Sequence, residues 1–123
     1  MIRPKVLYIG LEPSLVDFSS MPDLNAEKVS AGIGADIERM RASGYDATWF
    51  PLDRGETAEA SLGAELDRVA YDCVVVGAGI RAIPDHFLLF EKLVNVIHAR
   101  AASAKICFNT KPTDTLEAVR RWV

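Results

Sequence analysis

The fold is decided by the stretch Asp72-Cys73-Val74-Val75-Val76-Gly77-Ala78-Gly79-Ile80-Arg81. Its three consecutive valines predict a strand buried on both faces, because a strand covered by helices on either side shows an unbroken apolar run. Gly77 and Gly79 follow at the point where that strand ends. In an open parallel sheet, ligands bind at this end of the strands. The stretch therefore predicts an architecture and also the place of a site.

Strand and helix patterns alternate along the rest of the chain. Such alternation with short connections implies right-handed crossovers and a parallel sheet. We therefore predict one three-layer, flavodoxin-like or Rossmann-like α/β domain over residues 1–123, with a four-stranded parallel sheet in the order 2-1-3-4. The strands are expected at 5–9, 47–52, around 73–76 and at 105–108, and the helices between Asn25 and Gly44, at 57–69, at 84–102 and from Asp114 onward.

Composition excludes several classes of partner. Half of the 123 residues are hydrophobic, a quarter are charged, and the net charge is −3. This balance gives no electrostatic attraction to nucleic acid or to an anionic membrane surface.

The apolar run Val6-Leu7-Tyr8-Ile9 is too short for a signal peptide or a membrane span. With Cys73 and Cys107 both inside apolar runs, we expect a reduced, cytoplasmic protein in which the two thiols pack as small hydrophobes.

The strand order predicts a crevice between the ends of the first and third strands. With the order 2-1-3-4, the connections after these two strands leave toward opposite faces of the sheet. Gly10 and Gly77 are expected at the floor of the crevice, where the lack of a side chain lets a ligand approach the backbone. Both glycines fit tight turns equally well.

A long loop is expected to cover this crevice. Residues 11–24 form a connection of about fourteen residues, where strand-to-helix loops usually have two to six. Each polar residue at this edge, taken alone, also fits a solvated loop. The expected ligand contacts are Gly10, Glu12, Gly77, Gly79, Arg81, Asn109 and Thr110, and the other polar residues that gather there are Ser14, Asp17, Ser19, Ser20, Asp53, Arg54 and His86.

Familiar catalytic and cofactor motifs are incomplete. Gly77-Ala78-Gly79 lacks the third glycine of a dinucleotide-binding turn, and Asp85 occupies the first turn of the next helix, which disfavours a phosphate there. Two histidines twelve residues apart match no zinc spacing, and no serine elbow or Cys–His pair is evident. We expect no cofactor and no metal. An enzyme acting through Glu12, Asp17 or His86 is the third alternative for function.

The helix expected from Pro84 to Ala102 has an unusually wide apolar face, which covers roughly half of its circumference. One interpretation is a helix wedged deeply among its neighbours. The other is a surface through which the chain forms a homodimer or binds a partner, since large exposed apolar patches are rare on monomers. Leu88 adds an apolar residue to the otherwise polar face.

The last helix is expected to be capped by Asp114, with Glu117 three residues on. Leu116, Val119 and Trp122 should face inward.

The segment Tyr71-Asp72-Cys73-Val74-Val75-Val76-Gly77 resembles the third strand of response-regulator receiver domains. That resemblance, at the level of the fold, implies acidic residues at the ends of strands one and three, where this chain has Gly10-Leu11 and Gly77. Thr110 matches the receiver's hydroxyl residue after strand four, whereas the fifth strand and its lysine are missing. Without those carboxylates no magnesium-bound phosphoacceptor is expected.

The same segment is similar to universal stress proteins, whose later glycine and Ser/Thr phosphate motif does not follow Gly79. The chain also resembles small bacterial flavodoxin-like proteins without an assigned activity. Our leading hypothesis is a cytoplasmic protein that binds a small polar ligand at the carboxyl edge of the sheet. The alternative is a non-catalytic interaction module, dimeric or partner-binding through the helix at 84–102.

Overall fold

The computed structural model describes residues 2–123, apart from the side chain of Pro112. Within residues 2–123, four parallel strands form one sheet in the order β2-β1-β3-β4, which confirms the predicted topology. β1 lies in the middle, with Val6 beside Ala47 of β2 and beside Cys73 of β3. The strands are β1 (Lys5–Leu11), β2 (Asp46–Leu52), β3 (Cys73–Val76) and β4 (Lys105–Phe108).

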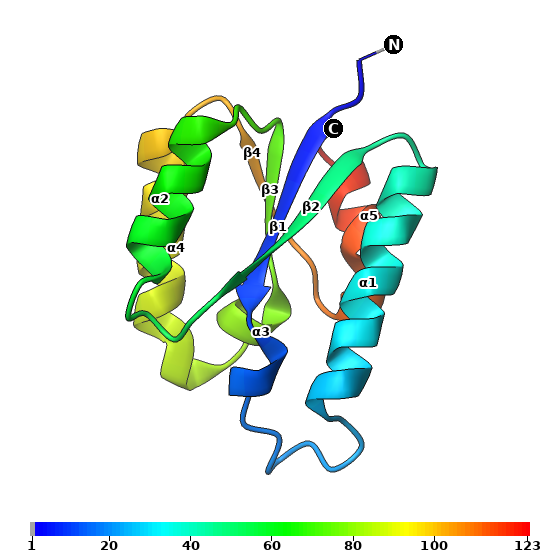
Figure 1. Ribbon diagram of the computed structural model, residues 1–123, viewed down its shortest axis with the longest axis vertical. Helices are drawn as coiled ribbons and strands as arrows, with labels where there is room; N and C mark the ends of the chain where they lie inside the picture. Colours follow the sequence, from blue (N-terminus) through cyan, green and yellow to red (C-terminus); the bar gives the residue numbers. More distant parts are fainter. Residues whose placement is uncertain (1) are drawn as a thin grey trace.

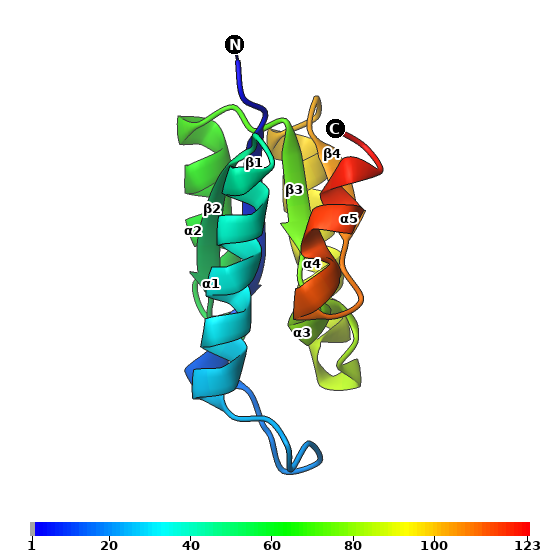
Figure 2. The same ribbon diagram turned by 90° about the vertical axis from the view of Figure 1, so that its right-hand side faces the viewer.

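Helices cover both faces of the sheet and complete a three-layer fold (Figures 1 and 2). α1 (Ala26–Ala42) and α5 (Thr115–Arg120) lie on one face, and α2 (Ala58–Arg68) and α4 (Phe87–Arg100) lie on the other. The shorter elements are the 3-10 turns η1 (Pro13–Leu15), η2 (Pro84–His86) and η3 (Pro112–Asp114) and the one-turn helix α3 (Ala78–Arg81).

The central strands separate two apolar layers. Val6 and Tyr8 of β1 pack with α1 and α5, whereas Leu7 and Ile9 pack with α2 and α4. All four residues of β3 are completely buried. The valine run is therefore a strand covered on both faces, as predicted.

The boundaries of α1 follow its capping residues. Asn25 Oδ1 accepts a hydrogen bond from Lys28 N at 2.8 Å, which satisfies one of the free N–H groups at the start of the helix. Gly44 has a φ of 95°, so it ends the helix in the left-handed conformation that favours glycine. Both features agree with the sequence prediction.

Two expectations about the strand ends need correction. β1 does not end at Ile9, because Gly10 and Leu11 continue the pairing opposite Pro51 and Leu52 of β2. After β3, Gly77 precedes the short helix α3, which the sequence did not predict. Among residues 2–123, only Gly44 and Gly55 have a positive φ. Gly10 and Gly77 therefore do not have the left-handed conformation for which a tight turn would require glycine.

The helix predicted at 84–102 begins as the 3-10 turn η2 and becomes α-helical from Phe87 to Arg100. Leu89, Leu93 and Ile97 are buried against the sheet and α2. Phe87 and Leu88, in the first turn, are 61% and 65% exposed. Most of the wide apolar face is thus taken up by the core, and an apolar patch remains at its N-terminal end.

The predictions for the last helix were wrong in two respects. Asp114 forms no side-chain cap on α5, because its carboxylate accepts hydrogen bonds from the backbone N–H groups of Thr110 and Lys111 in the preceding turn. Trp122 is 55% exposed and does not face inward, because α5 ends at Arg120 and Trp122 lies beyond the end of the helix. Leu116 and Val119 are buried as expected.

Candidate functional site

All four strands are parallel, so their carboxyl ends lie at one edge of the sheet. The strand arrows in Figure 1 point to the end of the molecule that holds α3 and the loop after β1. This is the edge at which open α/β sheets bind ligands. A ligand site is therefore expected among the segments that follow the strands.

The space between Gly10 and Gly77 is almost filled. The ring of Trp49 covers Gly10 so closely that a Cβ there would lie 2.7 Å from Trp49 Cη2. Tyr8 packs edge-on against Trp49, with ring centroids 5.0 Å apart, and a Cβ on Gly77 would lie 3.2 Å from the carbonyl oxygen of Ile9. The cavity left between these groups measures about 60 Å³. Ligand pockets usually measure roughly 300–1,000 Å³, so this one is too small for a metabolite.

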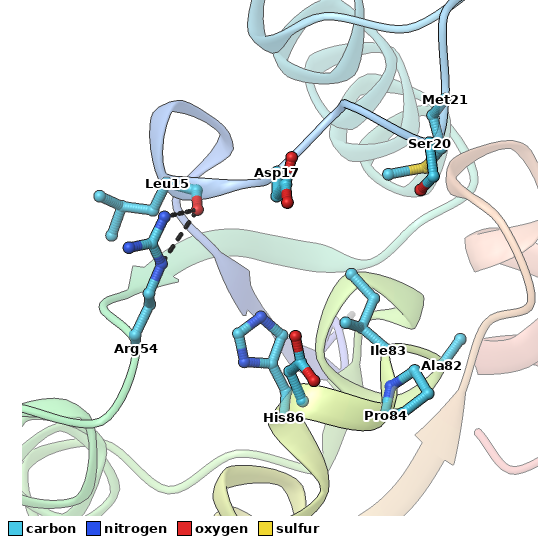
Figure 3. Close-up of a pocket in the computed structure, with 10 residues that line it drawn as sticks. Leu15, Asp17, Ser20, Met21, Arg54, Ala82, Ile83, Pro84 and His86 are labelled. Atoms are coloured by element: carbon cyan, nitrogen blue, oxygen red, sulfur yellow. Dashed lines mark hydrogen bonds between the residues drawn. The ribbon is translucent and has the colours of Figure 1, made fainter.

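A much larger cavity opens on the other side of the loop after β1. It measures about 720 Å³ and lies between that loop and the segment joining α3 to α4 (Figure 3). Its wall comes from the loop after β1, the loop after β2 and the segment after β3. The lining residues are Leu15, Asp17, Ser20, Met21, Arg54, Ala82, Ile83, Pro84, Asp85 and His86.

Arg54 fixes the loop after β1 at the rim of this cavity. Its Nε and Nη2 both donate to the carbonyl oxygen of Leu15, the former at 3.1 Å. The backbone N–H of Glu12 also donates to the carbonyl oxygen of Leu52 at 2.9 Å. These contacts anchor the beginning of the loop to the end of β2, so the cavity has a defined wall on this side.

Asp17 and His86 lie on opposite sides of the cavity, as Figure 3 shows. Asp17 Oδ1 accepts a hydrogen bond from Ser19 N at 3.0 Å. This bond, together with the charge of Arg54, lowers the pKa of the Asp17 carboxyl below its usual value. Asp17 is consequently an anion on the cavity wall at neutral pH.

Three of the expected ligand contacts lie together at the end of β4, outside the lining of the large cavity. Arg81 Nη2 donates to the carbonyl oxygen of Asn109 at 2.9 Å, while Arg81 Nε is buried without a hydrogen-bond partner among the described residues. Asn109 is 1% exposed, and its amide group is bonded to other parts of the protein. Thr110 bonds through its hydroxyl group to Asp114.

The remaining expected contacts, Glu12 and Gly79, lie at two smaller cavities. Glu12 accepts a hydrogen bond from Ser14 N at 3.4 Å and lines a separate cavity against α1, so it does not converge with Asp17. Gly79 is exposed and lines the small cavity together with Gly10, Gly77 and Asn109. Of the polar residues that the sequence assigned to this edge, the large cavity brings together Asp17, Ser20, Arg54 and His86.

No sequence motif indicates the apolar part of the cavity wall. No motif includes Leu15, Met21 or Ile83. The part of the wall formed by Ala82 and Pro84 depends on the helix α3, which the sequence did not predict. A sequence pattern could reveal them only if it predicted that the chain turns back after β3.

The thiols and carboxylates give no metal site. Within residues 2–123, no group of three or more His, Cys, Asp or Glu side chains is close enough to hold a metal ion. Cys73 and Cys107 lie on neighbouring strands with their Sγ atoms 3.3 Å apart, both buried in the apolar layer beside α1 and α5. The hydrogen bond to Cys107 and burial raise the pKa of the Cys73 thiol. The pair packs as small hydrophobes, as expected.

Comparison of the sequence with models of known protein families and with curated proteins gives no match. In residues 2–123, no helix is both long enough and apolar enough to cross a membrane.

Proposed function

We propose that this protein binds a small polar molecule at the carboxyl edge of its sheet, in the cavity between the loop after β1 and the segment joining α3 to α4. The observation that carries the proposal is the size and composition of that cavity. A volume of about 720 Å³ lies within the usual range for small-molecule sites. Its wall combines apolar surface from Leu15, Met21 and Ile83 with polar groups from Asp17, Arg54 and His86.

The arrangement of this wall favours binding. The polar groups come from three different strand ends, so the fold rather than one flexible segment sets their spacing. Arg54 holds one side of the loop in place through Leu15. We further propose that binding occurs in the cytoplasm, because both cysteines are free thiols and a reducing compartment keeps them so.

The test is an NMR titration of the ¹⁵N-labelled protein with polar metabolites of three charge classes: aliphatic amines, carboxylates and phosphate esters. We expect at least one class to shift the backbone amides of Asp17, Ser20, Arg54 and His86. Ala82→Trp places a large ring at the cavity wall and should abolish those shifts. Ala99→Trp, an equally bulky change at an exposed position of α4, should leave them intact. Unchanged spectra with every class would disprove the proposal.

A second function is favoured by the exposed apolar pair at the start of α4. Phe87 and Leu88 are 61% and 65% exposed, and side chains of this kind are common in interfaces between proteins. We propose self-association through this turn as the alternative function. Analytical ultracentrifugation should then show a dimer that Leu88→Glu dissociates, whereas Ile2→Glu, at a residue 94% exposed, should not affect it. A wild-type monomer at high concentration excludes the dimer.

A further inference from the structure

We infer that the ligand of the large cavity carries an ammonium group and is not a phosphate compound. This inference rests on the proposed function. Two observations support it. Backbone N–H groups at this edge of the sheet donate to side chains of the protein, and the cavity wall carries more carboxylates than cations.

Anionic ligands of α/β folds are held by backbone N–H groups that follow the strands and begin the helices. After β2, these groups already have an acceptor. Asp53 Oδ1 accepts from Gly55 N at 3.0 Å and from Thr57 N at 3.1 Å. After β4, Asp114 Oδ1 accepts from Thr110 N at 2.9 Å and from Lys111 N at 3.3 Å. A carboxylate therefore stands at each of these strand ends where a phosphate would have to bind.

The other two strand ends are satisfied in the same way. After β3, Ala78 N at the start of α3 donates to Asn109 Oδ1 at 2.9 Å. After β1, Ser19 N donates to Asp17 Oδ1 at 3.0 Å, and the first turn of α1 is capped by Asn25. Each strand end thus has at least one backbone N–H group that donates to a side-chain oxygen of the protein, and a phosphate would have to displace these oxygens. The starts of η2 and α4, at Ile83 and His86, have no such side-chain cap, so the charges of the cavity wall decide between an anion and a cation there.

The charged groups of the cavity wall favour a cation. The lining includes two carboxylates, those of Asp17 and Asp85, and one guanidinium, that of Arg54. Two of the nitrogen atoms of this guanidinium already donate to the carbonyl oxygen of Leu15. Carboxylate oxygens accept hydrogen bonds only, so a ligand that donates them pairs with this wall better than one that accepts them.

A second hollow of about 420 Å³ shares Arg54, Asp85 and His86 with the large cavity as lining residues. The second hollow adds Glu56, Glu59 and Lys92 to the wall. Lys92 Nζ lies 3.7 Å from Glu59 Oε1, so these two charges offset each other and Glu56 remains as a further anion.

The lining of the two hollows, taken together, therefore contains more carboxylates than Lys and Arg side chains. Leu15, Met21, Ile83 and Pro84 add apolar wall beside these carboxylates. This combination fits an aliphatic amine or diamine, with a short hydrocarbon chain along the apolar wall and an ammonium group near Asp85 or Asp17.

The test is a set of matched NMR titrations at constant ionic strength with 1,4-diaminobutane, butylamine, succinate and inorganic phosphate. We expect the two amines to shift the amides of the cavity residues, and succinate and phosphate to leave them unchanged. Asp17→Asn and Asp85→Asn should each weaken amine binding roughly two- to fivefold, as expected for the loss of one exposed ion pair. Asp23→Asn, in the same loop but outside the cavity lining, should leave the affinity unchanged.

The possible failures can be told apart. If succinate or phosphate shifts the cavity amides and the amines do not, the ligand class is wrong while binding at this cavity stands. If Asp23→Asn weakens amine binding as much as Asp85→Asn does, the amines are held only by the overall negative charge, and the inference is overturned. If no compound shifts these amides, both this inference and the proposed function fail.

Discussion

Asn109 connects several parts of the molecule through one buried side chain. Its Oδ1 accepts from Ala78 N at the start of α3, and its Nδ2 donates to Tyr8 Oη and to Thr115 Oγ1, both at 2.9 Å. The hydroxyl group of Thr115 in turn donates to the carboxylate of Asp36, which is completely buried in α1. A residue expected to contact a ligand thus uses its polar atoms to join β1, α3, α5 and α1.

This network makes Asn109 a sensitive position for stability. Asn109→Ala removes one acceptor and two donated hydrogen bonds inside the protein, and each buried polar group left without a partner costs about 1–3 kcal/mol. We expect the free energy of unfolding, measured with urea, to fall by at least about 1–3 kcal/mol. Asn95→Ala is the matched control, because Asn95 is exposed on α4 and donates only to the carbonyl oxygen of Glu91. Equal effects of the two changes would contradict the role of the network.

Asp53 should contribute to the pH dependence of stability. Hydrogen bonds from the side chain and backbone of Thr57 and from Gly55 N lower its pKa below the ordinary value of 3.8. Because the pKa is lower in the folded state, the carboxylate stabilises the fold above the unfolded pKa. That contribution is lost as the pH falls through the lowered value.

Asp53→Asn should therefore flatten the decline in unfolding free energy between about pH 5 and pH 3, measured by urea titration at each pH. Asp23→Asn, at an exposed position of the loop after β1, provides the comparison. Its profile should follow that of the wild type, and an identical profile for Asp53→Asn would count against the assignment.

At the scale of the element, α1 and the turn that ends it show how the same residue type serves two purposes. Gly34 lies inside α1 with no atom within 4 Å of its Cβ position, so its lack of a side chain is not required there. Gly44 follows the helix with a φ of 95°, a conformation that other residues adopt only with strain. Gly34 is thus dispensable inside the helix, whereas the backbone needs Gly44 at its end.

Gly34→Ala should therefore stabilise the protein by up to about 1 kcal/mol, since alanine is a better helix former than glycine. Gly44→Ala should destabilise it by about 1 kcal/mol, because alanine has to adopt the left-handed conformation. Thermal unfolding followed by circular dichroism measures both changes. A rise in Tm for Gly44→Ala would contradict the need for a left-handed conformation at this turn.

At the scale of the whole molecule, two apolar layers share one sheet. Residues of β1 and β3 alternate between the layer beside α1 and α5 and the layer beside α2 and α4. Both layers are built on the same strands, so the loss of either layer uncovers about half of the buried side chains of β1 and β3. We therefore expect the chain to unfold as one unit, in line with the single domain expected over residues 1–123.

This cooperativity can be measured with two probes. Trp122→Phe removes the exposed tryptophan and leaves Trp49, which packs against the layer beside α1. In this variant, the urea midpoint of Trp49 fluorescence should coincide with that of the far-ultraviolet circular dichroism signal, to which the helices of both layers contribute. Separate midpoints would show that the two layers unfold independently.

The sequence by itself determined the layer architecture and the strand order, since an unbroken apolar strand such as Val74–Val76 requires cover on both faces and short crossovers permit few topologies. It also indicated the edge of the sheet at which polar residues gather, including Asp17, Arg54 and His86. Only the tertiary structure decided where space remains at that edge. The Trp49 ring closes the glycine crevice from a neighbouring strand, and α3 turns the chain to form the larger cavity. The volume of a cavity depends on side chains that are distant in sequence, whereas the burial of a strand can be predicted from the residues of the strand itself.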